Sequence, residues 1–173
     1  MKARFFLPAL AVAILAQPVA AHLEDGQIWL IDYVNDSLYR IKADTWQTFT
    51  TLTAADGLDG PGAIGFTLHG DMILANYDSN ELMEWDGDST LSLAATSALG
   101  LAGPYGATGL IISPGHGDIF ISNYDNNEIL VLDENFQNPE VFADSGDGIF
   151  HPVAMALLAA GQPVVGNGHE DTL

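Results

Sequence analysis

The sequence has 173 residues with 23 acidic and only 4 basic side chains, which gives a formal net charge of −19. A surface with so few lysines and arginines cannot neutralise phosphate groups, so we expect neither nucleic acid nor anionic lipid as a direct partner. The sequence has no cysteine, which excludes disulfides, thiol catalysis and thiolate metal sites. We interpret the acidity mainly as a solubility feature, with cation binding as the alternative.

The N-terminal residues have the three parts of a secretory signal peptide. Lys2 and Arg4 come first, an apolar stretch from residue 5 to residue 16 follows, and small residues lead to a cleavage position after Ala21. The stretch is shorter than the roughly 18–20 residues that a membrane span needs. The sequence therefore predicts a secreted or periplasmic protein, with residues 1–21 as signal peptide, residues 22–173 as one domain, and no membrane span in the mature chain.

A 13-residue pattern recurs four times in the predicted domain. Its copies start at Gly26, Gly70, Gly117 and Gly161 and read GQIWLIDYVNDSL, GDMILANYDSNEL, GDIFISNYDNNEI and GQPVVGNGHEDTL. The second and third copies share seven of thirteen residues, and all four have Asp or Asn at the seventh position. Self-similarity at a period of 44 to 47 residues indicates a repeat architecture.

Each unit contains short apolar runs bounded by Gly, Asn and Asp, which is typical of strands rather than helices. In the third unit these runs cover residues 106–113, 117–123, 128–134 and 139–145. Four strands in about 45 residues predict an all-β fold, namely a β-propeller of four-stranded antiparallel blades.

The blade count predicts an incomplete ring of about three and a half blades. The first unit is expected to begin at its second strand, and the chain ends one residue into the third strand of its fourth unit. We expect an N-terminal fragment of a longer propeller, or alternatively a half-ring that dimerises. Either way, open strand edges predict self-association of the isolated chain.

The repeat windows resemble NHL-type repeats of six-bladed propellers. In that family a Gly, an apolar strand, an Asp and a Gly/Asn-rich turn follow one another, and a Pro-Gly pair opens the preceding strand. Pro61-Gly62 matches this pair, Pro104-Tyr105-Gly106 is longer by one residue, and His151-Pro152-Val153 lacks the glycine. The strand–turn rhythm is also similar to gluconolactonase/regucalcin-like and streptogramin-lyase-like propellers. Propellers carry many unrelated activities, so the resemblance implies the fold more than the function.

The units of this chain lack the metal-binding residues that the resemblance to gluconolactonases would imply. Resemblance to gluconolactonases implies metal-binding Asn residues in the inner strands, but Gly62, Tyr105 and Val153 stand at those positions. No catalytic residue and no metal ligand is assigned. The predicted function is an exported, non-enzymatic binding scaffold for a protein or glycan. The alternative is a metal-dependent lactonase, hydrolase or lyase whose active residues lie beyond Leu173.

The seventh-position residues are weak candidates for ligand binding. A ring of such polar groups around a pore is one interpretation, and a structural role in an Asx turn, accepting backbone N–H groups two residues on, is the favoured one. These residues are Asp32, Asn76, Asn123 and Asn167.

Three tyrosines that follow them, Tyr33, Tyr77 and Tyr124, form a second weak candidate set. They are interpreted either as a stacking platform for a sugar or as rings packed over the neighbouring blade with their hydroxyls in water.

Histidines and acidic clusters are weighed as metal ligands and set aside. His69 and His116 are expected in exposed turns, and a copper site at His22 has no other support in the sequence. The clusters at residues 55–60, 86–89 and 144–148 do not complete an EF-hand, so we expect turn formers with at most adventitious Ca²⁺ binding and no cofactor.

Overall fold

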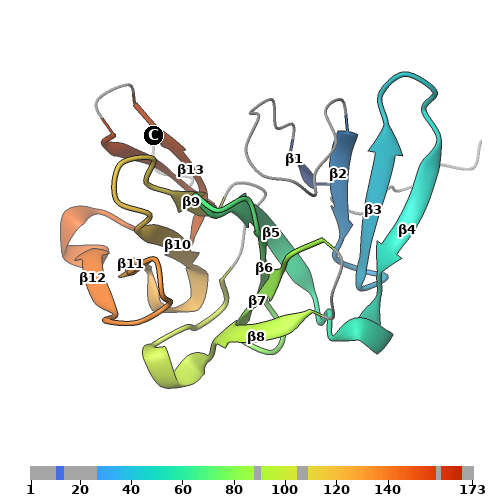
Figure 1. The fold of residues 1–173 in the computed structure, drawn as a ribbon. Helices are drawn as coiled ribbons and strands as arrows, with labels where there is room; N and C mark the ends of the chain where they lie inside the picture. The colour runs from blue at the N-terminus through green and yellow to red at the C-terminus, as the bar shows by residue number, and fades with distance from the viewer. Residues whose placement is uncertain (1–10, 14–26, 88–90, 105–108, 159–160, 169–173) are drawn as a thin grey trace, which may run out of the picture.

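The computed structural model describes residues 11–13, 27–87, 91–104, 109–158 and 161–168 (Figure 1). Its strands form three four-stranded antiparallel sheets and one two-stranded sheet, which confirms the predicted partial propeller. The first sheet contains β1 (Ala11–Ala13), β2 (Gln27–Asp32), β3 (Ser37–Lys42) and β4 (Thr48–Leu52). The second contains β5 (Pro61–Phe66), β6 (Met72–Asn76), β7 (Glu81–Trp85) and β8 (Ser92–Ala95). The third contains β9 (Leu110–Ile112), β10 (Ile119–Asn123), β11 (Glu128–Leu132) and β12 (Glu140–Ala143), and the last β13 (Pro152–Leu157) and β14 (Pro163–Asn167).

The sheets follow one another along an arc, and their first strands lie on its inner side (Figure 1). β5 contacts β9, and β9 contacts β13, so neighbouring blades meet along their inner strands. The described residues form no closed ring. The start of the predicted inner strand of the third unit, residues 106–108, lies outside the described residues.

The structure corrects one expectation about the first blade. The sequence was expected to supply no inner strand there, but β1 pairs antiparallel with β2 and completes a four-stranded sheet. β1 lies within the segment predicted as the signal peptide. An apolar sequence such as that of residues 11–13 fits both an inner blade strand and the core of a signal peptide, because both are free of charged residues.

Apolar layers between the sheets stabilise the arc. The central strands β6 and β10 are buried along their whole length, as expected for strands covered on both faces. One layer joins the first two sheets, where the Trp29 and Trp85 ring centroids lie 5.7 Å apart, edge to face. A second layer between the second and third sheets includes Ile73 and Leu130. The third layer, around Phe120 and Met155, is smaller, since among the described residues the last sheet contributes two strands.

Each connection between blades contains a short 3-10 helix: η1 (Ala54–Asp56), η2 (Ser97–Leu99) or η4 (Ser145–Asp147). A further 3-10 helix, η3 (Tyr124–Asn126), lies in the β10–β11 hairpin. In η1 and η4 an acidic side chain completes a capping box, and a left-handed glycine ends each inter-blade helix. The acidic clusters at 55–60 and 144–148 therefore contain capping residues, as their interpretation as turn formers implied. Part of the cluster at 86–89 lies outside the described residues. In the part of the chain that the structure describes, no helix is long and apolar enough to cross a membrane.

Candidate binding face

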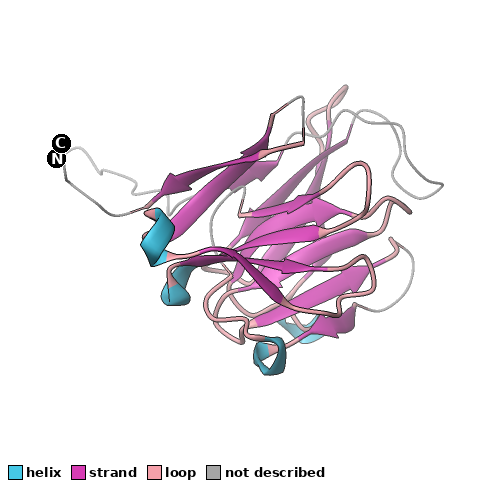
Figure 2. Ribbon diagram, turned by 90° about the vertical axis from the view of Figure 1, so that its left-hand side faces the viewer, coloured by secondary structure: helices cyan, strands magenta, loops and turns pink. Residues whose placement is uncertain are grey.

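The hairpins that follow β2, β6 and β10 and the connections that precede β5, β9 and β13 meet at one end of the sheets, which we call the hairpin face. Backbone bonds join the two kinds of loop: the Tyr77 N–H donates to the Gly60 carbonyl at 2.9 Å, and the Tyr124 N–H to the Gly103 carbonyl at 3.0 Å. Figure 2 shows the short helices gathered at this end of the strands. All seven candidate residues lie in or beside these hairpins or, in the case of Asn167, at the end of β14.

The three seventh-position amides clamp the inter-blade connections. The Asn123 Nδ2 donates to the Gly100 carbonyl at 2.8 Å, and its Oδ1 accepts the Ala102 N–H at 2.6 Å. Asn167 repeats this with the Gly148 carbonyl at 2.9 Å and the Phe150 N–H at 3.0 Å.

The third amide, Asn76, makes the first of these bonds only. Its Nδ2 donates to the Gly57 carbonyl at 2.9 Å, while its buried Oδ1 has no hydrogen-bond partner. Each acceptor glycine is the residue that ends a 3-10 helix.

The Asx-turn expectation is therefore right for Asp32 and wrong for the amides. Asp32 accepts the N–H groups of Val34 and Asn35, both at 3.1 Å, as a carboxylate in a local turn should. A carboxylate has no donor, whereas an amide carries both a donor and an acceptor. Of the two residue types at this position, only Asn can therefore donate to a carbonyl and accept an N–H of one remote loop at the same time.

The tyrosines form a row of rings across the blades. The Tyr33 and Tyr77 centroids lie 6.1 Å apart and those of Tyr77 and Tyr124 lie 6.4 Å apart, both edge to face. His151 continues the row with its ring 4.5 Å from that of Tyr124. Each of these side chains is partly exposed. The rings thus pack against the next blade, and we call these four residues the aromatic row.

Two of the tyrosine hydroxyls, which were expected in water, donate hydrogen bonds to carboxylates of the next hairpin. The Tyr33 hydroxyl donates to Asp78 Oδ1 at 3.0 Å. Tyr77 makes the equivalent contact with Asp125, and its pKa is raised by burial and then by the nearby Asp125 carboxylate. The row is therefore lined by negative charge.

A second polar contact between blades was not found from the sequence. The left-handed residues Asp36, Asn80 and Asn127 accept the backbone N–H groups of the residue that precedes each inner-strand proline. The signal was present, because the eleventh position of every repeat window is Asp or Asn.

The residue held by this contact differs between blades. Gly60 and Gly103 fill the position in the second and third blades, both with φ +59°, and His151 fills it in the last. A Cβ on Gly103 would lie 2.8 Å from the Tyr77 ring, so the glycines let the tyrosine ring pass directly above the backbone. At His151 the side chain stacks on the tyrosine instead.

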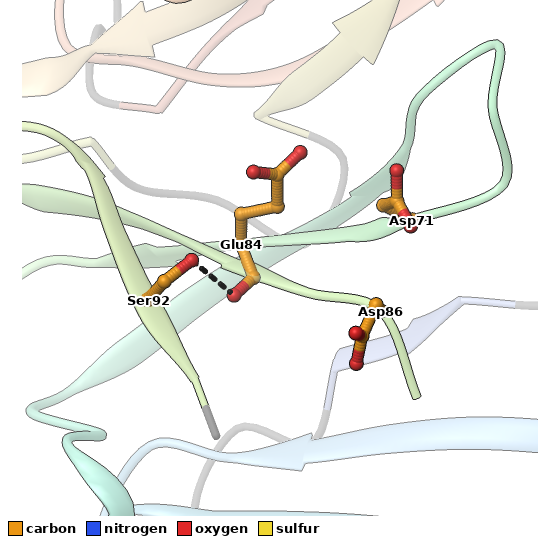
Figure 3. A pocket seen from close by; sticks show the side chains of 4 residues that line it. All are labelled: Asp71, Glu84, Asp86 and Ser92. Atoms are coloured by element: carbon orange, nitrogen blue, oxygen red, sulfur yellow. Dashed lines mark hydrogen bonds between the residues drawn. The ribbon is translucent and has the colours of Figure 1, made fainter. Parts of the chain in front are cut away.

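The opposite end of the second blade carries an acidic pocket lined by Asp71, Glu84, Asp86 and Ser92 (Figure 3). Burial raises the pKa of Glu84, and the Asp71 and Asp86 carboxylates raise it further. Among the described residues, no group of three or more His, Cys, Asp or Glu side chains is arranged to hold a metal ion.

The remaining metal candidates lie apart. His69 and His116 are exposed in the hairpins after β5 and β9. Of the positions at which gluconolactonases have Asn, Gly62 lies in β5, Val153 lies in β13, and Tyr105 is outside the described residues.

Comparison with known proteins supports the fold alone. No family model and no curated protein sequence matches the chain. The chain is similar to a structure of a nidogen/laminin complex, with TM-score 0.68, 16% identity, and coverage of 83% of this chain and 53% of that one. A gluconolactonase from Xanthomonas campestris gives TM-score 0.65 and 17% identity over 85% of this chain and 52% of that one. A virginiamycin B lyase from Staphylococcus aureus gives 0.61 and 13% over 85% and 54%.

These neighbours are β-propellers, and this chain spans about half of their length. By its fold, the chain is therefore a β-propeller repeat protein. Binding proteins and enzymes both occur among the neighbours, so the shared fold does not decide the activity of this chain.

Proposed function

We propose that this chain belongs to an exported, non-enzymatic propeller of NHL type that binds a protein or glycan on its hairpin face. The observation that carries the proposal is the aromatic row, four partly exposed rings that cross successive blades on one face. Rigid aromatic side chains supply contact area at a small cost in conformational entropy, which is why they are enriched in binding surfaces.

The electrostatic character of the face suggests what it would bind. Asp78 and Asp125 accept hydrogen bonds from the hydroxyls of Tyr33 and Tyr77. The whole chain carries a net charge of −19. Such a face would attract a partner that presents basic or hydroxyl-rich groups, and it would repel polyanions. The similarity to the propeller of a nidogen/laminin complex is in keeping with a protein partner.

The most direct test compares retention of partners by the chain and by two single variants. Tyr77→Ala removes the ring at the centre of the row, whereas Trp46→Ala removes a ring that is 73% exposed in the β3–β4 connection at the opposite end. We expect a glycan array and a panel of purified basic extracellular proteins to show ligands that Tyr77→Ala loses and Trp46→Ala keeps. Equal retention by both variants, or loss in Trp46→Ala alone, would place binding elsewhere.

A metal-dependent lactonase or lyase is the second candidate, supported by the similarity to a gluconolactonase and a virginiamycin B lyase. Calorimetric titration with Ca²⁺ and with Mg²⁺ separates it from the first. Stoichiometric heat that survives 0.15 M salt would favour the enzyme, because screening removes diffuse attraction to an acidic surface. A flat trace would favour the scaffold.

A further inference from the structure

The innermost strand of the first blade comes from the apolar core of the predicted signal peptide. β1 pairs antiparallel with β2 in the register Ala11↔Ile31, Val12↔Leu30 and Ala13↔Trp29. The three β2 residues occupy the sixth, fifth and fourth positions of the first repeat window. The pairing can therefore be compared position by position with the other blades.

Two of the three other inner strands meet the same repeat positions with the same kind of residue, whereas β9 of the third sheet places Ile111 opposite position four of its repeat. In the second sheet residues 63–65, Ala-Ile-Gly, pair with positions six, five and four of their repeat, and in the last sheet residues 154–156, Ala-Met-Ala, do so. Residues 11–13 read Ala-Val-Ala. The pattern of a small, a large apolar and a small residue is thus common to these three strands.

The small residues have a steric reason that is visible in the second sheet. β5 lies against β9 of the next blade, and a Cβ added to Gly65 would collide with the Leu110 side chain and lie 2.7 Å from Ile112 Cδ1. At this place in the second sheet the inner strands of neighbouring blades approach so closely that a large side chain has no room, although Ile111 stands at the same position of the third sheet. Ala13 holds the register position that corresponds to Gly65.

We propose that residues 11–13 have two mutually exclusive roles, as the core of the export leader and as the innermost strand of the first blade. The export half of this proposal rests on the proposed function; the strand half does not. A segment hydrogen-bonded to β2 cannot also be presented to an export machinery, so folding and export compete for the same residues. Removal of the leader leaves the inner edge of β2 without this strand, and an unpaired edge is a template for further pairing.

Hydrogen exchange tests the strand role directly. We expect the β2 amides of residues 27–32 to exchange at least 10-fold more slowly in the full chain than in a chain of residues 22–173, while the β6 amides of residues 72–76 change little. Equal protection of β2 in both chains would overturn the proposal.

Two variants of the full chain keep the test valid if the shortened chain does not fold. Ala13→Leu and Val12→Leu both keep the leader apolar, but only the first enlarges the residue at the Gly65-equivalent position. We expect Ala13→Leu to accelerate β2 exchange about 10-fold and Val12→Leu to leave it within 2-fold, since large residues stand at the Val12 position in the other sheets. Equal effects of the two variants would contradict the strand role.

The export role needs a separate readout. Residues 1–25 fused to a reporter enzyme that is active only outside the cytoplasm should give activity with the native sequence and with both leucine variants. An inactive reporter would refute export, and with it the proposed competition, while the exchange result would still decide the strand role. An active reporter together with a protected β2 supports both halves.

Discussion

Asn123, whose side chain is completely buried, should contribute strongly to stability through its hydrogen bonds to the inter-blade connection. Asn123→Ala removes the bonds to the Ala102 N–H and the Gly100 carbonyl, together with a 2.6 Å bond to Glu128 Oε1. Two neutral bonds contribute about 1 kcal/mol each, and a bond to a carboxylate about 1.5–3 kcal/mol. We therefore expect the free energy of unfolding to fall by about 4 kcal/mol.

The equivalent residues Asn167 and Asn76 provide controls for the destabilisation expected at Asn123. Asn167 makes the same pair of backbone bonds but is exposed, so water can replace the lost amide and Asn167→Ala should cost less than about 1 kcal/mol. Asn76 is buried but makes one of the two bonds, and Asn76→Ala should cost about 1–2 kcal/mol. The expected order of destabilisation is therefore Asn123, then Asn76, then Asn167.

Urea unfolding at pH 7, followed by circular dichroism, measures the three losses. With a urea dependence of about 2 kcal/mol per M, Asn123→Ala should lower the midpoint by about 2 M and Asn167→Ala by less than about 0.5 M. A similar drop for all three variants would refute the clamp, because the variants share a residue type and differ in burial and bonding. A loss at Asn167 larger than at Asn123 would refute it more strongly.

Further variants and conditions test other parts of the molecule. Gly103→Ala should destabilise by about 2–3 kcal/mol through strain at a positive φ and overlap with the Tyr77 ring, whereas Gly115→Ala, which has no atom within 4 Å of its added Cβ, should be nearly neutral in the same urea assay. Glu84 has a pKa raised by burial and by two neighbouring carboxylates, so its ionised form opposes folding and stability falls as pH rises through that pKa. Glu84→Gln should accordingly stabilise the chain by less than about 1 kcal/mol at pH 7 and not below pH 4; an equal gain at both pH values would contradict this cause. Adding 0.5 M NaCl should raise the urea midpoint, because screening weakens self-repulsion of a chain with net charge −19, and an unchanged midpoint would show that the repulsion is unimportant.

The period of the repeat, the class of fold and the positions of the hairpins could all be determined from the sequence. These features depend on local properties: apolar runs of strand length, and Gly, Asn and Asp where the backbone turns. The strands of the third unit, predicted at 117–123 and 128–134, are found at Ile119–Asn123 and Glu128–Leu132. The recurrence of Asn or Asp at the seventh position also marked the residues that matter structurally.

The partners of those residues were decided only by the tertiary structure. Asn123 reaches a loop 21 to 23 residues away, and Asn127 reaches His151 across a separation of 24. No local pattern distinguishes an amide that clamps such a loop from an aspartate that closes its own turn, because the two differ in what lies opposite them. The same holds for residues 11–13: their apolar sequence predicts a leader, and only their pairing with β2 in the tertiary structure identifies them as an inner strand.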